Sequence, residues 1–90
     1  MESKGKKLLL DVEQGKECIV YRVNGQGGFR HRVMEMGFVR GEKVKVIKSA
    51  PLQDPIEYKI MQSHVSLRRT EAAHIEVVDV DELSKDEKYA

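Results

Sequence analysis

The chain has 90 residues, of which 16 are basic and 15 acidic, so its net charge of +1 lacks the excess of a dedicated nucleic-acid-binding protein. Its apolar run Leu8–Leu10 is far too short for a membrane span or a signal-peptide core. Cys18 is the only cysteine, which excludes an internal disulfide and favours a reducing, cytoplasmic location.

The first clear strand is predicted over residues 16–23, where strand-forming side chains dominate. Before it, residues 8–15 hold a short apolar segment that we expect at a sheet edge, and residues 1–7 are expected to be a flexible lead. A glycine-rich turn follows the strand at residues 24–28. Its spacing matches no nucleotide-binding motif, so we interpret it as a connection.

A short helix is predicted over residues 29–36, because Phe29, Val33 and Met36 recur at helical spacing and share one side. Gly37 follows at the position where a helix commonly ends in a left-handed residue. Two turns of helix do not persist alone in water. We therefore expect this helix to pack against the strands.

Alternating apolar and charged residues predict the later strands at residues 43–50, 56–60, 64–68 and 75–80. Gln62 and Ser63 are expected to form a hairpin turn, and Thr70 is expected to cap a single helical turn before the last strand. Five short strands predict one mainly β domain, a small barrel over residues 8–80, with residues 81–90 as a flexible end.

The sequence contains no recognisable catalytic or metal-binding motif. The serines are scattered, and His31, His64 and His74 lie too far apart for metal-ligand spacing. We therefore expect neither an enzyme nor a bound cofactor. Binding of Fe2+ or Zn2+ would need side chains brought together by the fold, and the candidates are Cys18, His64, Glu71 and His74. Cys18 is better explained as a small buried hydrophobe.

Apolar side chains in and after the predicted helix exceed what covering a small barrel requires. Exposed methionine and aromatic groups suit contacts with another protein. The alternative is that all of them belong to the core. If they form a contact surface with their charged neighbours, the candidate residues are His31, Val33, Met34, Glu35, Phe38, Pro51 and Leu52.

Three motifs together are characteristic in their order and spacing. They are the block Met36-Gly37-Phe38-Val39-Arg40-Gly41, the loop Ala50-Pro51-Leu52-Gln53-Asp54-Pro55, and the strand end Ser66-Leu67-Arg68. In this order and spacing the chain resembles the FeoA family of ferrous iron transport accessory proteins. The resemblance implies an SH3-like β-barrel of about five strands, with a short helix inserted after the first long strand and one helical turn before the last. This fold agrees with the strand pattern.

The resemblance also implies a function. It implies a non-catalytic cytoplasmic regulator that does not itself span the membrane. Its expected partner is the FeoB-type ferrous iron transporter, at the cytoplasmic membrane face, and self-association is left open.

Two other functions stay open at this point. One is a metal-sensing SH3-like module that binds a transition metal ion directly and acts on another protein. The other is a small nucleic-acid-binding barrel with a patch formed by Arg22, Arg30, Arg32, Arg40, Lys43 and Lys45. Nearby acidic residues dilute this patch, so we expect no nucleic-acid partner.

Overall fold

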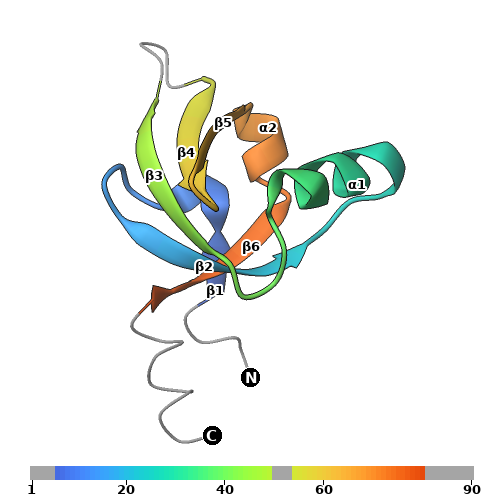
Figure 1. Cartoon of the computed structure of the whole chain (residues 1–90), viewed down its shortest axis with the longest axis horizontal. Coiled ribbons are helices and arrows are strands. Elements are labelled where there is room, and N and C mark those ends of the chain that lie inside the picture. The colour runs from blue at the N-terminus through green and yellow to red at the C-terminus, as the bar shows by residue number, and fades with distance from the viewer. Residues whose placement is uncertain (1–5, 50–53, 81–90) are drawn as a thin grey trace, which may run out of the picture.

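The structure is a computed structural model that describes residues 6–49 and 54–80. Within these residues six strands form one antiparallel sheet in the order β1-β6-β2-β3-β4-β5 (Figure 1). The elements in chain order are β1 (Lys6–Leu8), the 3-10 turn η1 (Leu9–Asp11), β2 (Glu17–Val23), α1 (Gly27–Met36), β3 (Lys43–Ser49), β4 (Ile56–Ile60), β5 (Ser63–Leu67), α2 (Arg69–Ala72) and β6 (Ile75–Asp79).

The sheet curls around a single core, and two irregularities in strand pairing help it to bend. The register shifts in β2 between Val20 and Arg22, and in β3 between Val46 and Lys48. Such bulges bend a strand and turn the extra residue in a new direction. In β2 the extra residue is Tyr21, which is half-buried between the buried Val20 and the exposed Arg22. Figure 1 shows α1 beside α2 at one side of the curled sheet.

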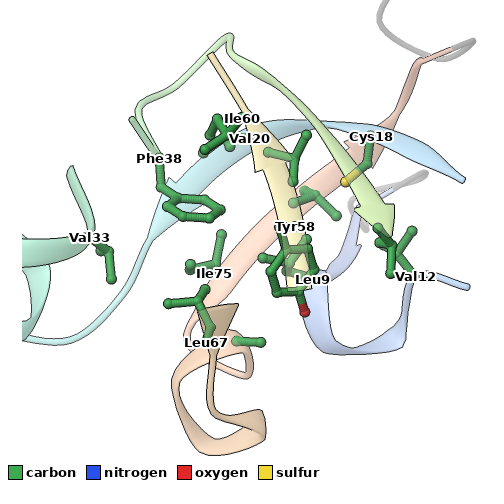
Figure 2. Packing of buried hydrophobic residues seen from close by; sticks show 14 of the residues in the cluster. Leu9, Val12, Cys18, Val20, Val33, Phe38, Tyr58, Ile60, Leu67 and Ile75 are labelled. Atoms are coloured by element: carbon green, nitrogen blue, oxygen red, sulfur yellow. The ribbon is translucent and has the colours of Figure 1, made fainter. Parts of the chain in front are cut away.

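The core is built from the inward-facing residues of strands β2 to β6, joined by residues from η1, α1 and α2 and from the segments that follow η1 and α1. Figure 2 shows Phe38, Tyr58 and Ile75 in this cluster. The Phe38 and Tyr58 rings meet edge to face, with centroids 6.3 Å apart and an interplanar angle of 89°. The buried cluster consists of Leu9, Val12, Cys18, Val20, Val23, Val33, Phe38, Val44, Val46, Ile56, Tyr58, Ile60, Leu67, Ala72, Ile75 and Val77.

The predicted helix and its glycine end are confirmed. α1 begins at Gly27, two residues earlier than predicted, and places Val33 fully in the core with Phe29 and Met36 packed beside it. Gly37 has a φ of 118°, and its backbone N–H donates to the carbonyl of Met34 at 3.1 Å. This left-handed residue ends the helix and directs the chain back into the core at the next residue.

The prediction of five strands is corrected to six over the residues that the structure describes. The additional strand is β1, in which Lys6 pairs with Val78 and Lys7 with Val77. These two lysines were expected in the flexible lead. β1 is held by backbone pairing at a sheet edge, where lysines are common, so it carries little apolar pattern. The outer bounds of the domain otherwise stay a prediction.

Two local predictions are also corrected. The β4–β5 hairpin turns at Met61 and Gln62, which have φ values of 52° and 70°, while Ser63 already belongs to β5. Positive φ at both central residues is what a two-residue hairpin turn of type I′ requires. Thr70 lies inside α2 and does not cap it. The helix begins after Arg68, whose backbone N–H donates to Glu71 Oε1 at 2.8 Å.

Candidate partner-binding surface

The outward side of α1 carries three of the seven predicted contact residues. Met34 is 36% exposed and is one of two large hydrophobic side chains exposed among the described residues. His31 and Glu35 are one helical turn apart, and His31 Nε2 lies 2.9 Å from Glu35 Oε2, with both side chains largely exposed. An apolar side chain with a charged rim is the arrangement expected of a protein contact.

Two of the other predicted contact residues do not lie on this surface. Val33 and Phe38 are both 0% exposed and lie in the core. They have no surface to offer a partner, so we remove them from the candidate set. Val33 is buried because it lies on the inward side of α1, and Phe38 is buried because the left-handed Gly37 turns the chain inward. Pro51 and Leu52 lie outside the described residues.

α1 is held in place by contacts with α2 and with His74, the residue before β6. The Arg32 guanidinium pairs with Glu71 of α2, and the Phe29 ring meets the His74 ring at a centroid distance of 5.4 Å. The backbone N–H of Arg68, followed by Arg32, lowers the pKa of Glu71 against a raising effect of burial. These contacts fix one side of the helix and leave His31 and Met34 on the other.

The predicted metal-ligand candidates are not brought together. Cys18 is buried in β2, and His64 lies on β5, where its Nδ1 is 2.7 Å from Glu57 Oε2. Glu71 and His74 are engaged with α1. Over residues 6–49 and 54–80, no group of three or more His, Cys, Asp or Glu side chains is arranged to hold a metal ion. The expectation that the chain holds no bound cofactor, and the alternative that it binds Fe2+ or Zn2+, both stay predictions.

Alkaline pH is expected to destabilise the fold through Cys18. Burial, reinforced by Asp79 and Glu17, raises the pKa of Cys18 from 9.0 to about 12. Between these values the unfolded chain loses the thiol proton and the folded chain keeps it. Stability therefore falls as the pH rises above 9, by up to about 1.4 kcal/mol per pH unit for one group. Burial also raises the pKa of Tyr58 above 10.0, which adds a second loss at higher pH.

Thermal unfolding followed between about pH 8 and pH 11 checks this expectation. In Cys18→Ala the decline should begin about one pH unit later, because Tyr58 is then the remaining group of these two with a raised pKa. Parallel declines in the two proteins would show that Cys18 does not titrate as the structure requires.

A groove lies between β2 and α1, on the same side of the helix as Met34. Its volume is about 280 Å³, and the buried Val23 and Phe38 form its base. Three cationic groups surround the ring of Tyr21: Lys6 Nζ at 3.9 Å, Arg40 Cζ at 4.5 Å and Arg22 Cζ at 5.7 Å from its centroid. We call this feature the basic groove and define it by its exposed or half-buried lining, Tyr21, Arg22, Arg30, Met34, Val39 and Arg40.

The sequence analysis named the three arginines of the basic groove but did not predict that they lie together around Tyr21. Arg22, Arg30 and Arg40 were assigned to a broad patch together with Arg32, Lys43 and Lys45. In the structure Arg32 turns to Glu71 on α2, and the two lysines lie on β3. No spacing rule links Tyr21 to Arg40, because the bulge in β2 and the turn after α1 bring them together.

A sequence model of the FeoA domain matches residues 7–79. The chain belongs to the FeoA family. A curated relative from Porphyromonas gingivalis, strain W83, is 49% identical over 69 residues, and it is an Fe(2+) transport protein A/Fe(2+) transporter FeoB fusion protein. The match covers 77% of this FeoA chain and 8% of the relative, so the chain corresponds to a small part of that polypeptide.

Solved structures of FeoA proteins share the fold. The solution structure of the Chlorobium tepidum FeoA protein is 36% identical, with a TM-score of 0.78 over 82% of this chain and 70% of that one. The zinc complex of Stenotrophomonas maltophilia FeoA, described as a prokaryotic SH3 domain protein, is 24% identical, with a TM-score of 0.71 over 79% and 88% of the two chains. The predicted FeoA membership and SH3-like fold are thus confirmed, and the family is one of ferrous iron transport.

Proposed function

We propose that this chain is a non-catalytic accessory domain of ferrous iron uptake that binds and modulates a FeoB-type transporter at the cytoplasmic membrane face. The observation that carries the proposal is the Porphyromonas gingivalis relative, in which a segment 49% identical to this chain is part of the same polypeptide as FeoB. Fusion keeps two domains in one place at high effective concentration. The proposal is that this chain makes the same association without needing that covalent link.

The architecture is consistent with a binding role. Among the described residues no helix has the length and hydrophobicity to cross a bilayer. The exposed side of α1, formed by His31, Met34 and Glu35, offers a partner a surface that the fold does not use. Its contacts with α2 hold this surface rigid, which lowers the entropy lost on binding.

The direct test is retention of a FeoB-type transporter in detergent on the immobilised domain, with a GTP analogue, with GDP and without nucleotide. Specific retention is the expected result. A dependence on nucleotide would identify a regulator, whereas equal retention in all three states would identify a scaffold. Failure of the transporter to bind in any state would overturn the proposed function.

Replacing Met34 with aspartate is expected to weaken transporter binding by about thirtyfold, about 2 kcal/mol, because a buried charge replaces an apolar anchor. Binding of the transporter, measured by biolayer interferometry, checks this value. Gln14→Asp is the matched control, since it adds the same charge at an exposed site in the loop between η1 and β2, away from α1 (Figure 1). Equal affinities for the two variants would remove α1 from the interface.

A further inference from the structure

We propose that the basic groove binds an acidic peptide segment of the partner protein, with one apolar side chain of that segment seated against Met34. The inference deepens the proposed function, because it names the chemistry of the segment that the transporter would present.

The charge of the basic groove is of one sign. Arg22, Arg30 and Arg40 line the groove. Lys6 adds a fourth cation, which lies over the ring of Tyr21. Across the described part of the chain, no carboxylate lines the groove and no ion pair engages its three arginines. These cations together lower the pKa of Tyr21, with Lys6 as the main cause. A segment rich in glutamate or aspartate would supply the missing opposite charge.

The size and base of the groove favour a peptide side chain. About 280 Å³ lies just below the roughly 300–1,000 Å³ typical of small-molecule sites. Met34 and Val39 bring apolar surface to the lining, and the buried Phe38 lies beneath them. An apolar contact inside a charged rim resembles the centre of a protein interface.

The groove is also preformed. Arg30 Nε donates to the carbonyl of Val23 at 3.2 Å, which ties α1 to β2 across the groove. The backbone N–H of Gly41 donates to the carbonyl of Val20 at 2.9 Å, and this bond holds the turn that carries Arg40. Cationic side chains that are already placed lose less entropy when an anionic segment binds.

Nucleic acid is the less favoured occupant. Single strands bind to proteins largely by stacking bases on aromatic rings. Among the residues that define the groove, the aromatic ring is that of the half-buried Tyr21, and the cationic ends of Lys6 and Arg40 lie over it at 3.9 and 4.5 Å from its centroid. A base would have to displace them, whereas carboxylates would bind them where they are.

The test uses 15N-labelled protein and a short peptide of glutamates with one central leucine. We expect chemical-shift changes that concentrate at Tyr21, Met34 and Arg40, an affinity that falls with added salt, and weaker binding of a glutamate-only peptide. The double variant Arg22→Glu/Arg40→Glu should bind the peptide more than about tenfold more weakly.

The control is Lys45→Glu/Lys59→Glu, which makes the same change of charge at a cross-strand pair of β3 and β4. Its affinity for the peptide should stay near that of the wild type, and thermal unfolding of both variants verifies that they fold. Shift changes outside the groove, no shift changes, or equal losses in the two variants would overturn the proposal. Tighter binding of oligouridylate at the same resonances would also overturn it, in favour of nucleic acid.

Transporter retention by the two double variants separates this inference from the proposed function. If the wild type and Arg22→Glu/Arg40→Glu retain the transporter equally, the groove is not the contact and the proposed function stands. If the wild type retains no transporter, the proposed function fails, and the peptide titration still decides what the groove binds.

Discussion

Replacing Phe38 with alanine is expected to lower the free energy of unfolding by about 3–5 kcal/mol. The ring is 0% exposed and meets Tyr58 edge to face, so its removal leaves a cavity that the surrounding strands cannot fully fill. A chain of 90 residues is stable by only roughly 5–13 kcal/mol. The loss would therefore remove a large part of the total stability.

Urea unfolding followed by circular dichroism measures this loss. The control is Met34→Ala, four residues earlier, where the side chain is partly exposed and the expected change is within about 0.5 kcal/mol. The comparison also decides whether Phe38 is a partner-contact residue or a core residue. A contact residue would tolerate alanine in the unfolding experiment and lose partner binding, whereas a core residue would destabilise the fold. A loss in Phe38→Ala no larger than that in Met34→Ala would contradict the structure.

The second large effect is expected at Gly37. Alanine there should cost about 1–3 kcal/mol, because a φ of 118° is a conformation that side chains rarely adopt. A Cβ at this position would also come within 2.7 Å of Met61 Sδ. Met61→Ala in the same chain would relieve that contact and leave the backbone strain, so the double variant separates the two causes.

Gly28→Ala is the matched control for Gly37→Ala. Gly28 lies in α1, and a Cβ there meets no atom of the described residues within 4 Å. Alanine at this position should raise stability by about 0.4–1 kcal/mol, since it restricts the unfolded chain. Thermal unfolding of both variants gives the comparison. Equal stabilities would mean that the end of α1 does not depend on a left-handed glycine.

Regular hydrophobic patterns in the sequence predicted the helix and the strands, because these elements repeat with a fixed number of residues per turn or per face. Val33 and its neighbours at helical spacing located α1, a run of strand-forming side chains located β2, and alternation located the strands from β3 onward. The end of α1 was also predictable, because a glycine directly after an apolar helical face has a specific conformational use. These features depend on local sequence and on burial of one face.

Features without a period could not be predicted in the same way. Phe38 follows the helix in a segment with no repeating pattern, so its sequence position did not distinguish core from surface. The lysines of β1 carry no strand signal because their strand is held by pairing with β6. The turn at Met61 and Gln62 lacks the glycine or asparagine that usually marks positive φ. The basic groove needs three separate segments and a bulge at Tyr21.

The pairing of β1 with β6 has a consequence for how this domain combines with others. Lys6 lies opposite Val78 in that pair, so the polypeptide enters and leaves the fold at neighbouring points, about 5 Å apart between Cα atoms. A domain of this kind can be joined at either end, or inserted within a loop of a larger protein, with little distortion of its host. Modular shuffling of such a unit into a transporter gene would require no rearrangement of the sheet.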